Sequence, residues 1–265
     1  MIKILISAVL FFSFMNCSVS AAFIKNVDFG LQADEVVITF LPLSAGEASL
    51  IQDGSGETIL INTGNASSYP ELKKWLKRYK VKKINQLVIT KQQKHYDSNV
   101  LRAVNDYHIE RIIVPAQYQA EFQTEKWKEN DLFQLTNNIH VDVLHASKQK
   151  IAAMDLLFTI GEHRILYAMS SSDEVEEKFL RIPLTHVDVL KIPDFGEGTF
   201  FSNAFLKQLD TQLAVAFTKP GRSYSPRLIS NLTAEWIELY DVREGSAYSI
   251  KMSLKSYDVM KFSAK

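Results

Sequence analysis

Histidine and aspartate side chains that could hold a metal ion occur at several separate places in this sequence. His95 and Asp97 are close together in one polar segment, and Asp173, His186 and Asp194 follow later in the chain. Imidazole and carboxylate groups are the usual ligands of zinc in hydrolytic sites. The six histidines show no H-x-H or H-E-x-x-H spacing, although zinc hydrolases commonly use such local patterns. These residues therefore indicate a metal site only if the fold brings separate loops together.

The elements that would position these residues alternate between apolar strands and amphipathic helices. Runs of β-branched residues predict strands, and apolar residues three or four apart predict helices. The predicted strands are Val36–Leu41, Ala48–Gln52, Glu57–Ile61, Gln86–Thr90, Arg111–Val114, Ile139–Leu144, Asp155–Ile160, Arg164–Ala168, Val187–Ile192, Leu213–Phe217, Trp236–Tyr240 and Tyr248–Met252. The predicted helices are Tyr69–Lys80, Asn99–Tyr107, Ala120–Glu129, Asp173–Arg181, Ser202–Leu209 and Arg227–Leu232. This order predicts one α/β domain with two sheets face to face and helices outside.

Three segments, in order, resemble motifs of the metallo-β-lactamase fold. Phe40–Gln52 is similar to F-L-D-V-G-Q-G-D-A-x-L-I-Q, Ile61–Gly64 to I-D-T-G, and Asp188–Glu197 to D-V-L-K-V-P-H-H-G-S. These patterns are those of the soluble hydrolase-like domain of bacterial competence DNA-uptake channel proteins, which the chain resembles most. The resemblance covers roughly residues 36–253. It implies a four-layer αββα sandwich, which we expect to form one domain over residues 23–265.

The resemblance also implies a binuclear zinc site, but the residues at the matching positions are not the ligands that such a site uses there. Lysine repels a divalent cation and phenylalanine has no donor atom, whereas zinc needs nitrogen, sulfur or oxygen ligands. The degenerate positions are Lys91, Gln93, His95, Tyr96, Ser170, Asp194, Phe195 and Ser225. We therefore expect no catalytic residue, no metal and no cofactor at this site.

Three functional hypotheses remain open. The first is a pseudoenzyme that acts as a non-catalytic binding or scaffold module. The second is a phosphoesterase-like or nuclease-like hydrolase with a zinc site rebuilt around His95, Asp97 and Asp194. The third is an accessory domain of a secretion or uptake assembly, in which Tyr96 and Phe195 fill the former cleft. Three N or O ligands that converge within metal distance would favour the second hypothesis.

Other catalytic patterns receive little support. The sequence has no G-x-S-x-G nucleophile motif, which argues against that class of acyl-transfer enzymes. The run from Ser170 to Asp173 is typical of a helix N-terminus, because hydroxyl and carboxylate groups accept from free backbone N–H groups there. Gly196-Glu197-Gly198 lacks the lysine of a phosphate-binding P-loop.

A basic segment is the main charge feature of the chain, whose formal net charge is zero. Nine lysines and arginines and no acidic residue lie between positions 73 and 94. The residues with which such a face could bind an anion are Lys73, Lys74, Lys77, Arg78, Lys91 and Lys94. The candidate partners are an anionic polymer or an envelope protein. The simpler interpretation is a solvated helix face that acidic residues elsewhere balance.

The first residues have the pattern of an export signal. Lys3 precedes an apolar run over 4–14, and small residues around Ala21 fit a cleavage site, so we predict a signal peptide over 1–22. The mature chain is then periplasmic or secreted, without a transmembrane segment. Cys17 is the one cysteine. The sequence disfavours a lipid anchor at Cys17, because bulky Asn16 and Phe14 stand where lipoprotein signals carry a small residue and leucine.

Overall fold

The fold was determined from a computed structural model, which describes residues 26–147, 149, 151–198, 201–243 and 245–263. The predicted signal peptide over 1–22 and the alternative anchor at Cys17 lie outside the described residues. Within the described ranges, no helix is both long enough and apolar enough to cross a membrane.

The first of two large sheets contains the N-terminal strands and the last two strands of the chain. Its order is β15-β14-β1-β2-β3-β4-β5-β6. The strands are β1 (Val36–Leu41), β2 (Ala48–Asp53), β3 (Thr58–Ile61), β4 (Gln86–Val88), β5 (Arg111–Pro115), β6 (Glu125–Trp127), β14 (Ser246–Met252) and β15 (Tyr257–Ser263). From β3 to β6 the neighbouring strands are parallel, and the others pair antiparallel.

The second sheet is built from the middle of the chain, in the order β13-β12-β11-β10-β9-β8-β7. Its strands are β7 (Leu132–Thr136), β8 (Ile139–Ala146), β9 (Met154–Ile160), β10 (His163–Tyr167), β11 (Val189–Lys191), β12 (Leu213–Phe217) and β13 (Glu238–Val242). It also has an antiparallel part, β7 to β10, and a parallel part, β10 to β13. The two halves of the chain therefore repeat one α/β arrangement.

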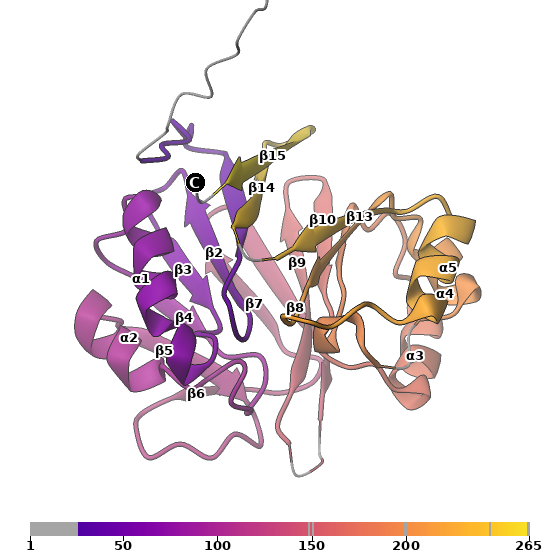
Figure 1. Cartoon of the computed structure of the whole chain (residues 1–265), viewed down its shortest axis with the longest axis horizontal. Coiled ribbons are helices and arrows are strands. Elements are labelled where there is room, and N and C mark those ends of the chain that lie inside the picture. Colours follow the sequence, from indigo (N-terminus) through magenta and orange to yellow (C-terminus); the bar gives the residue numbers. More distant parts are fainter. Residues whose placement is uncertain (1–25, 148, 150, 199–200, 244, 264–265) are drawn as a thin grey trace, which may run out of the picture.

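Helices cover the outer face of each sheet, so the molecule has four layers (Figure 1). Helices α1 (Tyr69–Arg78) and α2 (Val100–Tyr107) lie against the first sheet. Helices α3 (Asp173–Leu180), α4 (Asn203–Leu209) and α5 (Pro226–Ala234) lie against the second. This is the αββα sandwich that the sequence predicts.

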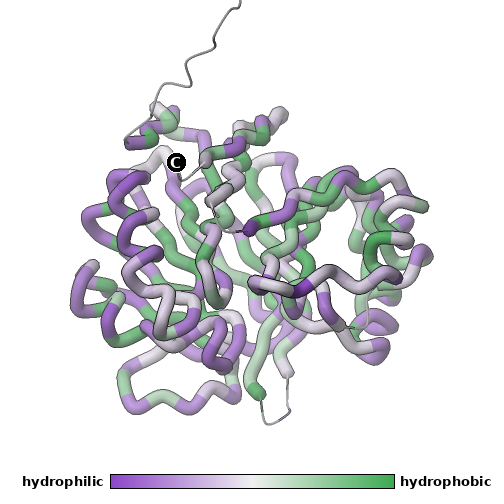
Figure 2. The backbone as a smooth tube through the Cα atoms, viewed as in Figure 1, coloured by the Kyte–Doolittle hydropathy of each residue, from purple (hydrophilic) through white to green (hydrophobic). Residues whose placement is uncertain are grey.

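The apolar core has the three parts that a four-layer sandwich requires. One cluster lies between the sheets and includes Phe40, Trp127 and Phe158. The other two lie between a sheet and its helices, with Trp75 on one side and Phe205 on the other. Hydrophobic residues accordingly concentrate in the strands, and hydrophilic residues on the outer faces of the helices (Figure 2). Burial of these side chains is the main source of folding free energy.

Most predicted elements are confirmed, with small shifts at their ends. The predicted helix at Ala120–Glu129 is wrong, because this segment contains strand β6, which pairs with β5. Trp127 explains the difference: its ring is fully buried and stacks on Phe133, with centroids 4.2 Å apart. Burial of one large side chain outweighs the helical preference of the polar residues around it. Strands β7 and β15 were not predicted.

Gly46 lies in the loop between β1 and β2, where this loop packs against the backbone of Gly64, Asn65 and His95. Its φ is +88°, and a Cβ atom at this position would lie 2.5 Å from the backbone nitrogen of Asn65 and closer still to the carbonyl oxygen of His95. The next residue, Glu47, donates its backbone N–H to that same carbonyl at 2.9 Å. Glycine is therefore required for both conformation and space.

We predict that Gly46→Ala destabilises the protein more than Gly56→Ala. Gly56 has a similar φ of +95°, but a Cβ atom added there would have no other atom within 4 Å. Both variants carry the cost of left-handed backbone, about 1–2 kcal/mol, and Gly46→Ala adds overpacking of about 1–3 kcal/mol. Urea unfolding of both variants measures the difference. Equal destabilisation would contradict the crowding at Gly46.

Candidate functional site

Four loops meet at one edge of the sandwich and carry most of the positions that the sequence analysis singled out. They follow strands β4, β10, β11 and β12, and the carboxyl ends of neighbouring parallel strands lie at the same edge of a sheet. The loop after β4 also joins the second sheet. Lys91 and Ala153 form an isolated antiparallel β-bridge, and Met154 donates its backbone N–H to the carbonyl of Thr90 at 2.8 Å. The edge is therefore shared by both halves of the chain.

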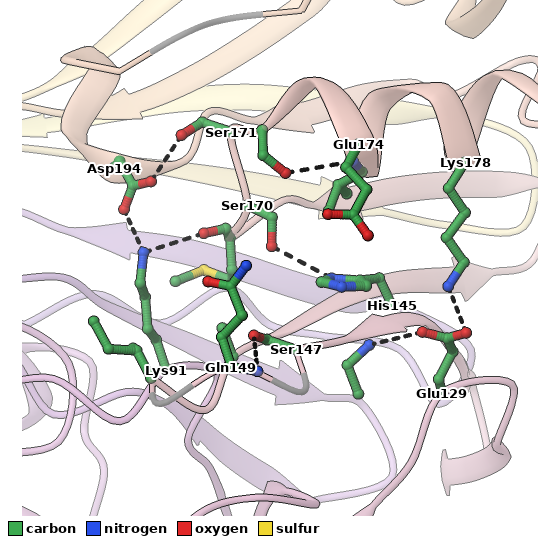
Figure 3. A pocket seen from close by; sticks show the side chains of 16 residues that line it. Lys91, Glu129, His145, Ser147, Gln149, Ser170, Ser171, Glu174, Lys178 and Asp194 are labelled. Carbon is green, nitrogen blue, oxygen red and sulfur yellow. Dashed lines mark hydrogen bonds and ion pairs between the residues drawn. The ribbon is translucent and has the colours of Figure 1, made fainter.

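An ion pair between Lys91 and Asp194 lies at the centre of this edge (Figure 3). Lys91 Nζ is 2.5 Å from Asp194 Oδ1 and 3.4 Å from the carbonyl oxygen of Met169. Ser171 donates its hydroxyl to the other carboxylate oxygen at 3.0 Å. The Lys91 side chain is 12% exposed and that of Asp194 33%. A lysine ammonium thus connects the loops after β4, β10 and β11.

Aromatic side chains fill the space next to this ion pair. Tyr96 is fully buried and Phe195 nearly so, with ring centroids 5.9 Å apart. His95 packs edge-on against Phe195 at 5.5 Å. Burial, together with the charges of Lys219 and Lys94, lowers the pKa of His95. Its imidazole is therefore neutral at neutral pH, and its ring contributes mainly packing.

A second ion pair lies deeper, with both side chains fully buried. Lys191 Nζ, at the end of β11, is 2.5 Å from Glu47 Oε2. The ammonium also lies over the ring of Tyr167, 5.2 Å from its centroid. Burial raises the pKa of Glu47. Removing one partner would leave an uncompensated buried charge, so this pair ties β11 to the loop before β2.

Asp155 organises the other side of the edge. It is fully buried at the start of β9, and its Oδ1 accepts from the backbone N–H groups of Met169 and Ser170 at 2.6 and 2.9 Å. Oδ2 accepts from the Ser170 hydroxyl at 2.7 Å and lies 2.9 Å from His145 Nδ1. Burial acts to raise the pKa of Asp155, but the hydrogen bonds from His145, Ser170 and Met169 together hold it below the ordinary value. Asp155 is therefore ionised in the folded protein.

The remaining predicted site residues take separate places. Gln93 is exposed on the first loop, and the backbone N–H of Ser225 donates to the carbonyl of Gly196 at 2.8 Å, which brings α5 to the edge. Asp97 accepts a hydrogen bond from Tyr118 at 3.1 Å, and burial raises the pKa of Asp97. His186 is exposed and pairs with Asp210, so the expectation that it could approach the site is wrong.

The serines after β10 behave as a helix start, as the sequence predicts. Ser172 is the N-cap of α3, and its hydroxyl oxygen accepts from the backbone N–H of Val175. This contact satisfies one of the free N–H groups of the first turn.

The basic residues are divided between two regions. Lys73, Lys74 and Lys77 lie exposed on α1, and Lys73 pairs with Asp106 at 3.3 Å. Arg78, at the end of α1, donates to the carbonyl of Ser263 and stacks over Trp75. Lys91 belongs to the central ion pair instead, and exposed Lys94 lies on its loop. An anion-binding face on α1 remains a prediction.

Sequence reasoning missed four residues that organise the edge: Glu47, His145, Asp155 and Lys191. A usable signal was present for two of them, because Asp155 is the one charged residue of β9 and Lys191 is the one charged residue of β11. Charged side chains at buried strand ends need a partner. The identity of those partners depends on the packing of the two sheets and cannot be read from spacing.

The same arrangement of sheets and helices occurs in solved structures of other proteins. YhfI from Bacillus subtilis, described as a metallo-β-lactamase fold protein, is 12% identical over 82% of this chain and 100% of its own, with a TM-score of 0.60. The chain has the metallo-β-lactamase fold. Igni18, a metallo hydrolase from Ignicoccus hospitalis, is 15% identical over 86% of this chain and 99% of its own, with a TM-score of 0.57. CmlA β-hydroxylase matches over 83% of this chain and 54% of its own, at 11% identity and a TM-score of 0.56. No protein-family model matches the sequence, and a search of curated proteins finds no match.

The metallo-β-lactamase fold implies a metal, but the groups at this edge do not fit one. A divalent cation needs several lone-pair donors, and here an ammonium contacts Asp194 while Phe195 supplies no donor. His95, Asp97 and Asp194 each contact a different partner and do not form a shared site. Over the described part of the chain, no group of three or more His, Cys, Asp and Glu side chains could hold a metal ion.

We predict that Asp155→Asn destabilises the protein at neutral pH and that the effect fades in acid. The new amide has only one acceptor oxygen, whereas both oxygens of the Asp155 carboxylate accept from N–H or O–H donors. Some of these donors would therefore lose their acceptor, at a cost of about 1–3 kcal/mol. The folded-state pKa of Asp155 is lowered, so its stabilisation is present above the unfolded pKa of about 4 and is lost as pH falls through the folded pKa.

Urea unfolding of both proteins at a series of pH values measures this effect. The exposed Asp258 on β15 supplies the control, because Asp258→Asn should change stability by less than about 0.5 kcal/mol. A difference between wild type and Asp155→Asn that stays constant into strong acid would show that the Asp155 charge does not stabilise the fold.

Proposed function

We propose that this chain is an exported metallo-β-lactamase-fold protein that has lost the metal site and acts as a non-catalytic binding module. The contact that carries the proposal is the ion pair between Lys91 and Asp194, with Nζ and Oδ1 2.5 Å apart. The pair places the lysine ammonium beside the Asp194 carboxylate and the Met169 carbonyl, two oxygen groups that would otherwise repel one another or bind a metal. A fold does not dictate function, so the proposal depends on these groups and not on the relatives.

The aromatic packing supports the same proposal. Tyr96 and Phe195 occupy the edge with buried rings, and hydrolysis in such folds needs an open coordination position for water. Burial, with the nearby charge of Glu47, raises the pKa of Tyr96 well above its ordinary value. The phenol is therefore neutral and does not supply a phenolate ligand.

A binding role also needs an accessible surface, and the edge retains one. Beside the ion pair lies a cavity of about 560 Å³, lined by polar side chains from both halves of the chain (Figure 3). This volume lies within the range of about 300–1,000 Å³ that is usual for small-molecule sites. A smaller cavity of about 290 Å³ lies on the aromatic side of the ion pair, against His95, Tyr96 and Phe195. The polar cavity is therefore the larger of these two openings.

Metal content tests this proposal directly. Mature protein purified without chelator and offered zinc and manganese should retain less than about 0.1 equivalent of either metal by mass spectrometry. An intact zinc site would keep its metal through purification, because such sites bind zinc very tightly. A chelator-treated sample sets the background. One bound equivalent that disappears in His95→Ala or Asp97→Ala would contradict the proposal and favour the rebuilt hydrolase site.

A further inference from the structure

The cavity beside the ion pair has a polar wall whose groups are already oriented. It is reached by His145 from β8, by Ser170, Ser171 and Ser172 from the loop before α3, and by Ser147 after β8. In Figure 3 the side chains of His145, Ser147 and Ser170 lie between Lys91 and Lys178. Aliphatic groups of Ile151, Met169 and Val175 also line the cavity, together with the polar side chains of Gln149 and Glu174. No other cavity described in the structure combines these features.

Asp155 fixes the orientation of His145 in this wall. The buried carboxylate lies behind the histidine and can only accept, so the Nδ1 atom at 2.9 Å must carry the proton. In the neutral imidazole the other nitrogen, Nε2, is then a hydrogen-bond acceptor. Among the described residues, no hydrogen bond engages Nε2, and the His145 side chain is 17% exposed. The cavity therefore contains a prepositioned acceptor.

The serine hydroxyls supply the complementary groups. Ser147 accepts from the backbone N–H of Gln149 at 3.2 Å, and Ser172 accepts from that of Val175, so both hydroxyl protons are available to a ligand. Ser171 donates to Asp194, so its oxygen can still accept. The wall thus offers both hydrogen-bond donors and acceptors.

The charged groups of the cavity are largely paired with one another. Lys91 binds Asp194, and Lys178 lies 2.5 Å from Glu129. An anionic ligand would have to compete with these carboxylates for the two ammonium groups. A ligand that both donates and accepts through neutral hydroxyls would leave the pairs intact.

We propose that this cavity binds a polyhydroxylated, sugar-like molecule, with His145 Nε2 accepting from a ligand hydroxyl. The inference rests on the proposed function, because it assigns a ligand class to the binding module. The serines contact the neighbouring hydroxyls, and the aliphatic lining contacts the C–H face of the ring. Asp155 is a positioning residue, since it acts through His145.

Saturation-transfer NMR with four neutral disaccharides tests this assignment: maltose, cellobiose, lactose and chitobiose. At least one should show saturation transfer from the wild-type protein, with a Kd below about 10 mM, an affinity near −3 kcal/mol. The His145→Asn variant keeps an N–H donor for Asp155 but loses the Nε2 acceptor, and should bind at least about tenfold more weakly. His140→Asn is the matched control, because His140 lies exposed on the same strand, and it should bind like wild type.

A second variant keeps the test decisive if His145→Asn fails to fold. Ile151→Trp fills the cavity from a partly exposed position away from Asp155, and it should abolish binding. Absence of binding for all four sugars, binding that both variants retain, or binding of inorganic phosphate alone would each overturn the assignment. Metal-free protein that binds no sugar would refute only this inference, whereas a stoichiometric metal would refute the proposed function as well.

Discussion

The edge of this sandwich depends on a positive charge where its four loops converge. Asp194 and the carbonyl of Met169 both point to one place, and a metal ion commonly neutralises such a group of oxygen atoms in proteins. Here the ammonium of Lys91 performs that task from within the chain. Because Lys91 belongs to the loop after β4 and its partners to the loops after β10 and β11, the contact joins the two sheets.

Local backbone strain is consistent with this central role. Asp194 and Phe195 have φ values of +46° and +57°, in the left-handed region that side chains disfavour. Such residues persist only where the surroundings hold them. Lys91 and Ser171 bind the Asp194 carboxylate, and Phe195 is held by Tyr96 and by Lys219, whose ammonium lies 4.5 Å from the ring centroid. The strained backbone is thus held by the ion pair and the aromatic packing at the edge.

Two sets of buried polar contacts connect different segments beneath this edge. Lys191 and Glu47 connect the end of β11 to the loop before β2, and Asp155 connects the start of β9 to the loop after β10. Each pair links segments that are distant in sequence but adjacent in the sandwich. The site is therefore preorganised by buried charged groups whose contacts stabilise the fold, while His145 and the serines remain available to the proposed ligand.

The sequence predicted the layers well because strand and helix periods repeat over whole elements. The αββα arrangement and the cap at Ser172 follow from local patterns, and the pairing of motifs at one edge follows from the family resemblance. Strand β6 was missed because Trp127 is buried by a partner, Phe133, whose contact depends on how the strands pack. The contacts of Lys91 and His145 were missed for the same reason: each spans a sequence separation that only the packed sheets define.

A double-mutant cycle on Lys91 and Asp194 tests the central claim most directly. The single variants Lys91→Met and Asp194→Asn and the double variant would be compared with wild type by urea unfolding at neutral pH. If the ion pair holds the edge together, the two changes should be coupled by about 1–3 kcal/mol, as for other contacting residues. Effects that add to within about 0.3 kcal/mol would show that the pair is incidental, and another interaction would then have to connect the loops.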